Sequence, residues 1–146
     1  MGQQHMILIK NGRVVDPVTN TDKIMDVLIK DNKIAEVSEH IEASGAQVID
    51  AAGLVVAPGL VDTHVHFRDP GFTYKEDIET GARAAAKGGF TMVVCMANTK
   101  PAVDNIETLD YIQKKGEKTG INVLQTATVT KGLKGTELVD MEQLAA

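Results

Sequence analysis

The spacing of hydrophobic and polar positions divides this 146-residue chain near residue 66. Before that point, short apolar runs alternate with turn residues such as Asn11-Gly12 and Asp31-Asn32. Such pairs are typical of β-hairpins, because both central residues of a type I′ turn need a positive φ. Residues 39–46 are polar and predict a loop. The pattern predicts a small antiparallel, β-sandwich-like unit over residues 6–56.

After residue 66 the apolar side chains recur at helical spacing, and predicted helices alternate with predicted strands. Capping-box pairs start the first two helices, and glycines end them. The strand between them is apolar throughout, as expected in a parallel sheet covered on both faces. The βαβαβ order predicts an α/β fold with right-handed crossovers. The predicted elements are helices from Thr73, Asp104 and Thr136 and strands over residues 90–96 and 121–126.

The number of predicted strands bears on the length of the whole protein. Three parallel strands cannot close a barrel, which needs eight strands and about 250 residues. The last predicted helix runs to Ala146 without a stop signal. We therefore interpret residues 57–146 as the first βα units of a truncated TIM barrel, and the chain as the N-terminal portion of a longer protein. Residues 1–5 resemble an expression-tag remnant, because the patterned sequence begins at Met6.

Composition narrows the classes of partner. A net charge of −5, no Trp and only 3% aromatic residues argue against a nucleic-acid surface, which needs basic patches and stacking platforms. No apolar run approaches the ~18 residues of a membrane span, so we expect no membrane partner. The single Cys95 excludes an intrachain disulfide and lies in an apolar run, which favours a buried thiol in a cytoplasmic protein.

Two histidines end the apolar strand that precedes the helical part of the chain. His64 and His66 are two residues apart, so their side chains point to the same side of a strand, and Arg68 joins them if the backbone stays extended. Pro70-Gly71 then breaks the strand. This places the three side chains at its carboxyl end, where α/β sheets and barrels bind ligands.

Each candidate side chain has a simpler interpretation. A lone histidine in a strand is usually structural, but the spacing of His64 and His66 favours metal ligands. Arg68 is either a surface charge or, beside the histidines, a bidentate clamp for a carboxylate. Asn98 follows the next strand on the same rim, and is either a site residue or a turn residue before Pro101.

Two acidic residues flank this group and leave two interpretations each. Asp62 either contacts the site or ends the strand. Asp69 either holds Arg68 or caps the turn. The sequence pattern leaves both questions open.

Residues 62–71, with the sequence DTHVHFRDPG, and residues 96–101, with the sequence MANTKP, closely resemble dihydroorotases of the bacterial class in the amidohydrolase superfamily. The resemblance covers residues 6–146. The His-x-His element is typical of the whole superfamily, whereas the Arg-Asp-Pro-Gly run and the Asn98 segment point to dihydroorotases. Ala97 stands where that family usually has proline.

The resemblance implies a (β/α)8 metal-dependent hydrolase barrel, incomplete in this chain, preceded by the small antiparallel β unit. It implies a zinc enzyme of pyrimidine biosynthesis that interconverts dihydroorotate and carbamoyl aspartate. His64 and His66 would bind one zinc of a pair, and Arg68 and Asn98 would hold the substrate carboxylate. The other ligands and the catalytic residues are expected beyond Ala146, so none of the catalytic residues lies in this chain. A homodimer is expected for the complete enzyme.

Two other interpretations remain. The chain could be part of another cyclic-amide hydrolase, such as an allantoinase or a dihydropyrimidinase. Arg68 weighs against this, since a neutral ring substrate needs no carboxylate clamp. It could also be a non-catalytic scaffold domain that kept the β unit and half a barrel.

Overall fold

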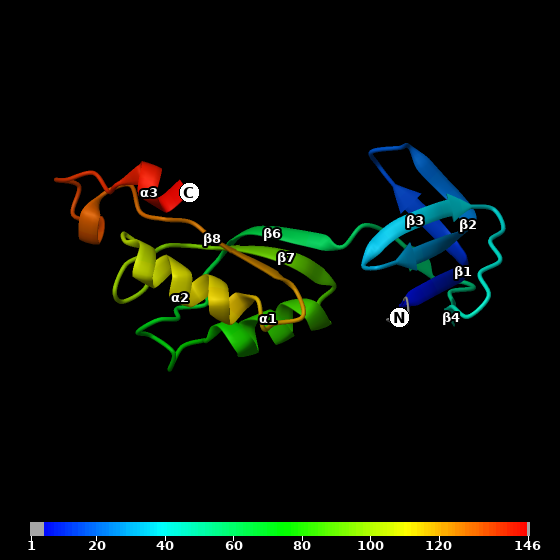
Figure 1. Cartoon of the computed structure of the whole chain (residues 1–146), viewed down its shortest axis with the longest axis horizontal. Coiled ribbons are helices and arrows are strands. Elements are labelled where there is room, and N and C mark those ends of the chain that lie inside the picture. The colour runs from blue at the N-terminus through cyan, green and yellow to red at the C-terminus, as the bar shows by residue number, and fades with distance from the viewer. Residues whose placement is uncertain (1–4, 146) are drawn as a thin grey trace. The chain divides into compact units, whose positions relative to one another are not determined.

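The computed structural model describes residues 5–145, which form two compact units (Figure 1). The first unit ends at Pro58 and the second begins at Gly59. The tag remnant expected over residues 1–5 lies, apart from His5, outside the described residues.

The first unit is a single five-stranded sheet. Its strands are β1 (Met6–Asp16), β2 (Thr21–Lys30), β3 (Lys33–Ser38), β4 (Gln47–Asp50) and β5 (Val55–Val56). The order is β3-β2-β1-β4, and β5 also pairs with β1. The neighbours β1, β2 and β3 are antiparallel, but β4 and β5 run parallel to β1. The sheet is therefore mixed, and the expectation of an antiparallel unit is wrong, because the loop after β3 returns the chain in the direction of β1.

Of the two predicted hairpin turns, the structure of residues 5–145 has the one at Asp31-Asn32 but not the one at Asn11-Gly12. Asp31-Asn32 turns between β2 and β3 with a positive φ at both residues, as predicted. Asn11-Gly12 instead lies inside β1, where Asn11 has a φ of 63° and the register with β2 shifts. The buried Asp26 carboxylate accepts the backbone N–H groups of Asn11, at 2.9 Å, and Ile41, at 3.0 Å. The Asp26 side chain thus provides an acceptor for the Asn11 N–H, which the bulge in β1 would otherwise leave without a hydrogen bond.

The second unit has the predicted βαβαβ order. Its elements are β6 (Leu60–Val65), α1 (Ile78–Lys87), β7 (Phe90–Cys95), α2 (Ile106–Gly116), β8 (Asn122–Gln125), the 3-10 turn η1 (Lys131–Leu133) and α3 (Met141–Ala145). The three strands are parallel, in the order β6-β7-β8. The α/β class is therefore confirmed, with the carboxyl ends of three consecutive strands at one edge of the sheet.

The helices begin later than the capping-box pairs predict. The N-cap residues of α1 and α2 are Asp77 and Asn105, and each side chain accepts the backbone N–H three residues later at 2.9 Å. Thr73 lies in the turns before α1, and Asp104 immediately precedes the Asn105 cap. Helix α3 likewise begins five residues after Thr136, which was expected to cap it.

Helices α1 and α2 lie along the same face of the sheet (Figure 1). The residues buried between these layers are Phe67, Ile78, Ala82, Val93, Cys95, Ala97, Val103, Leu109 and Ile112. Ile78, Val93 and Ile112 are at most 1% exposed, and burial of each such side chain stabilises the fold by about 1.5–3 kcal/mol. On the other face of β7, Met92 and Val94 are only half-buried. Within residues 5–145, this strand is therefore fully covered on the face that the helices pack against, but not on the opposite face.

Candidate functional site

The two histidines lie at the carboxyl end of β6. His64 is the last but one residue of the strand and is exposed, whereas His66 follows the strand and is half-buried. Their rings meet edge to face with centroids 5.1 Å apart. Asp62 accepts the backbone N–H of His64 at 3.0 Å, which is the hydrogen bond of a turn at a strand end. The predicted spacing therefore brings the two imidazoles together.

Asn98 contacts the second histidine. Its Oδ1 lies 2.8 Å from Nδ1 of His66. The two loops meet because the Met96 N–H donates to the Val65 carbonyl at 2.9 Å, which extends the pairing of β6 and β7 beyond the strands. Since an amide oxygen only accepts, the His66 proton belongs on Nδ1, and the lone pair of Nε2 remains for a metal ion. Asn98 therefore contacts a candidate metal ligand.

Arg68 departs from the strand direction. Its φ is 64°, a conformation that is uncommon for residues other than glycine. The side chain is half-buried, and within residues 5–145 its guanidinium has neither a hydrogen bond nor an ion pair. The extended backbone that would align Arg68 with the histidines is absent, so strand alternation does not determine where its side chain lies.

The loop that carries Arg68 packs against the loop that carries Asn98. The Lys100 N–H donates to the Pro70 carbonyl at 3.0 Å. Gly71 has a φ of 90°, and a Cβ atom placed on it would lie 2.0 Å from the Lys100 carbonyl oxygen. Only glycine permits this approach of one backbone to the other. The contact brings the two loops with candidate carboxylate-binding residues to one rim.

The sequence did not reveal the partners of Asp69. This side chain is buried and accepts from Nζ of Lys115 at 2.6 Å and from the Tyr111 hydroxyl at 3.0 Å. It does not hold Arg68, and its contact with the start of α1 is a 3.4 Å bond from the Ile78 N–H. Lys115 lies 46 residues away in sequence, so no local pattern indicates the pair. The one available signal was that Tyr111 and Lys115, four residues apart, share a face of α2.

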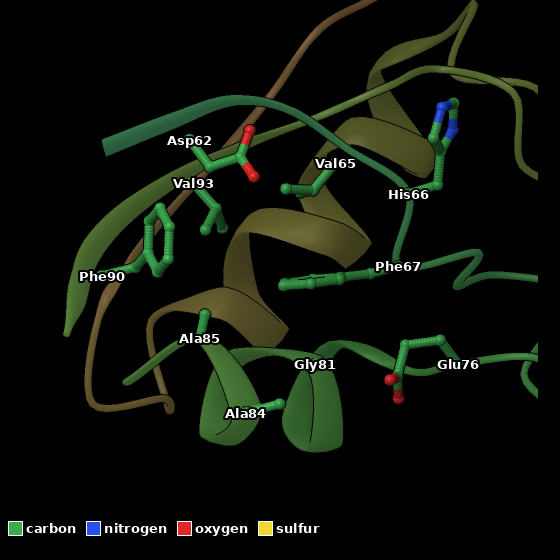
Figure 2. Close-up of a pocket in the computed structure, with 10 residues that line it drawn as sticks. All are labelled: Asp62, Val65, His66, Phe67, Glu76, Gly81, Ala84, Ala85, Phe90 and Val93. Atoms are coloured by element: carbon green, nitrogen blue, oxygen red, sulfur yellow. The ribbon is translucent and has the colours of Figure 1, made fainter. Parts of the chain in front are cut away.

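A pocket of about 340 Å³ lies between the sheet and α1 (Figure 2). The residues that line it are Asp62, Val65, His66, Phe67, Glu76, Gly81, Ala84, Ala85, Phe90 and Val93. The Phe67 ring extends into this pocket, whereas the His66 ring points away from it (Figure 2). A Cβ atom on Gly81 would lie 2.5 Å from the Phe67 ring, so glycine allows α1 to approach it. His66 therefore borders this mainly apolar pocket, but its imidazole ring is directed away from it.

The donor atoms suit a zinc ion but are too few to complete a site. Zinc takes three or four protein ligands, with imidazole nitrogen among the commonest. His64 and His66 supply two of them, and the Nδ1 proton of His66 leaves its other nitrogen free for a metal. Within residues 5–145, no group of three or more His, Cys, Asp or Glu side chains is placed to hold a metal ion. A complete site needs ligands from elsewhere.

The parallel βαβαβ unit has the fold found at the start of hydrolases of the amidohydrolase superfamily. Among solved structures, the L-hydantoinase (dihydropyrimidinase) from Arthrobacter aurescens has a TM-score of 0.74 and 29% identity, over 85% of this chain and 28% of that chain. A D-hydantoinase has a TM-score of 0.68 and 30% identity, over 95% of this chain and 36% of that chain.

Sequence comparison narrows this class to one family. The model of the Dihydro-orotase-like family matches residues 53–146, and the chain belongs to that family. The dihydroorotase of Clostridioides difficile is 61% identical over 140 residues, which is 95% of this chain and 33% of that protein. The dihydroorotase of Clostridium acetobutylicum is 56% identical over the same shares. The chain thus spans about a third of the length of these curated relatives, and the resemblance found in its motifs is confirmed.

None of the helices within residues 5–145 has the length and apolar character that crossing a membrane requires.

Proposed function

We propose that this chain is part of a zinc-dependent dihydroorotase, which interconverts dihydroorotate and carbamoyl aspartate in pyrimidine biosynthesis. The observation that carries the proposal is the 2.8 Å bond between His66 and Asn98, which joins a candidate metal ligand to a candidate substrate ligand. Relatives named dihydroorotase, 55–61% identical to this chain, support it. A polypeptide of the relatives' length that contains this chain is called the full-length protein below.

The strands β6, β7 and β8 are proposed to be the first three of a (β/α)8 barrel. Active sites of such barrels lie at the carboxyl ends of the strands, where His64, His66 and Asn98 are found. His64 and His66 hold one zinc ion of a pair, and Asn98 keeps the His66 ring in the orientation and tautomer that this requires. When bound, zinc lowers the pKa of a water molecule to about 7 and polarises the ring carbonyl. The remaining ligands and the catalytic acid and base come from outside residues 5–145.

The substrate carboxylate is bound by Arg68 and Asn98. A guanidinium matches a carboxylate with two parallel N–H bonds. The Asn98 amide uses Oδ1 for His66, and its NH₂ group has no partner among residues 5–145. That group is available to the same carboxylate. Asn98 thereby links the orientation of a metal ligand to the position of the substrate.

Similarity to hydantoinases of known structure supports a second candidate, the hydrolysis of a neutral cyclic amide. Arg68 favours dihydroorotate, because a neutral ring offers no carboxylate.

The proposal includes a homodimeric, cytoplasmic enzyme. A reducing compartment suits Cys95, a buried thiol whose pKa burial raises to about 11.

The test is turnover by the full-length protein. We expect it to convert dihydroorotate to carbamoyl aspartate, to lose this activity on chelation and to regain it with zinc. Dihydrouracil and hydantoin, which are neutral rings without a carboxylate, are tested as alternative substrates. Turnover of these rings without turnover of dihydroorotate would support the hydantoinase alternative, and turnover of none would leave the scaffold interpretation.

A further inference from the structure

An ion pair between Asp69 and Lys115 joins the loop that carries Arg68 to helix α2. The Asp69 side chain is fully buried, and that of Lys115 is 27% exposed. Nζ of Lys115 lies 2.6 Å from Oδ2 of Asp69. This hydrogen bond, together with the charge of Asp69, raises the pKa of Lys115 although desolvation lowers it. Lys115 is therefore the one cation that contacts the buried Asp69 side chain among residues 5–145, and a buried carboxyl group depends on such a partner.

Three donors from two helices converge on this carboxylate. Tyr111 and Lys115 lie one turn apart on α2, and both donate to Asp69. The Nζ atom of Lys115 also lies 5.8 Å from the centroid of the Tyr111 ring, within the range of a cation–π contact. The third donor is the Ile78 N–H at the start of α1, at 3.4 Å. Both helices are thus tied to the residue that follows Arg68.

The backbone at Arg68 needs such support. Its φ of 64° is unfavourable for a side chain with a Cβ atom, and it persists only where surrounding contacts enforce it. On one side the loop is held by the 2.9 Å bond from the Phe72 N–H to the Arg68 carbonyl. On the other side it is held through Asp69, whose partners all lie on the helices. Loss of Lys115 would leave the buried carboxyl group without its charged partner and would weaken this support of the loop.

We propose that Lys115 is a positioning residue for substrate recognition: through Asp69 it fixes the loop of residues 66–71 so that Arg68 presents its guanidinium to the substrate carboxylate. The inference rests on the proposed function for the identity of that substrate. It assigns a role in carboxylate binding to a residue on the outer helix layer, which does not itself touch the substrate.

The chain offers a matched control. Lys114 is the neighbour of Lys115 and pairs with Asp110 at 3.4 Å, but both side chains are exposed, at 73% and 47%. An exposed pair of this kind contributes little to stability. Lys114→Met and Lys115→Met therefore remove the same charge from the same helix, and only the second change reaches the Arg68 loop.

The experiment compares these variants in the full-length protein. We expect Lys115→Met to raise KM for dihydroorotate about tenfold or more, as loss of a supporting partner commonly does, while kcat changes by less than about twofold. Lys114→Met should match the wild type, and Lys115→Arg should restore most of the affinity because it keeps the charge. An unchanged KM in Lys115→Met, or a fall in kcat alone, would overturn the inference.

Hydrogen exchange of the Phe72 amide gives a readout that does not need activity. We expect it to exchange about tenfold faster in Lys115→Met than in Lys114→Met, with the β7 amides unchanged. If the wild type does not turn over dihydroorotate, the proposed function fails, and equal Phe72 exchange in the two variants would overturn the loop-positioning role as well. If Lys115→Met does not fold, Tyr111→Phe, which removes one donor to Asp69, replaces it, and unchanged exchange and KM in that variant would overturn the inference.

Discussion

Single side chains carry the chemistry proposed for this chain, and the two histidines are the pair that a metal titration can test. The 146-residue chain should bind zinc weakly, because His64 and His66 are two ligands where zinc takes three or four. Replacing either histidine with alanine should abolish this binding in calorimetry. His40→Ala is the control, since His40 is exposed in the first unit.

Two results would contradict the assignment of these ligands. One is tight zinc binding that survives both His64→Ala and His66→Ala. The other is an equal loss of binding in His40→Ala, which would show that zinc associates with any exposed imidazole of the chain.

Local spacing in the sequence predicted the positions of three candidate site residues. His64 and His66 were predictable because alternate residues of a strand share a side, and Asn98 because consecutive parallel strands end at one edge. The placement of Arg68 was not, since its positive φ depends on contacts made elsewhere in the fold. Asp69 was missed for a related reason, because its partner Lys115 is distant in sequence.

Among the elements, the two loops at the carboxyl edge form a unit whose fit depends on Gly71. We expect Gly71→Ala to destabilise the full-length protein by about 1–2 kcal/mol for the positive φ and by roughly another 1–3 kcal/mol for the clash with Lys100. Because the clash displaces the loops of Arg68 and Asn98, KM for dihydroorotate should rise as well. Thermal unfolding and steady-state kinetics measure the two effects.

Gly89→Ala separates the backbone strain from the clash. Gly89 has a φ of 85°, but a Cβ atom placed there meets no described atom within 4 Å. This variant should lose only the stability that the positive φ accounts for and should keep the wild-type KM. Equal effects of Gly71→Ala and Gly89→Ala would show that the contact with Lys100 is unimportant.

Periodicity predicted the order of the elements better than their boundaries or pairing. The βαβαβ order follows from alternating spacings of two and about 3.6 residues, which are local properties. The helix starts were displaced because Asp77 and Asn105 compete with nearby residues that can also cap. The parallel pairing of β4 and β5 with β1 was missed because it joins segments about 40 residues apart, and a bulge at Asn11 was mistaken for a turn.

For the whole molecule, the apolar surface of the second unit predicts self-association of the 146-residue chain. Leu60, Val61 and Leu124 are each about half exposed, at 53%, 52% and 48%. Within residues 5–145, β6 and β8 pair only with β7, so each leaves one edge open. Open edges and exposed apolar surface favour association with other chains.

Sedimentation and thermal unfolding of the isolated chain test this expectation. We expect oligomers or a broad, weakly cooperative transition at low micromolar concentration. A monomer with a sharp two-state transition would show that these strands need no further cover, and would contradict the interpretation of the second unit as part of a larger barrel.

Discrimination between two substrates by the full-length protein tests the central claim most directly. Dihydrouracil has the same ring as dihydroorotate without the carboxylate. Arg68→Met should lower kcat/KM for dihydroorotate about ten- to a hundredfold, since a charge-assisted contact is worth about 1.5–3 kcal/mol, and should leave kcat/KM for dihydrouracil unchanged. Arg83→Met, at an exposed position of α1, should change neither. An equal loss for both rings, or no loss for dihydroorotate, would contradict a site built to bind the carboxylate through Arg68.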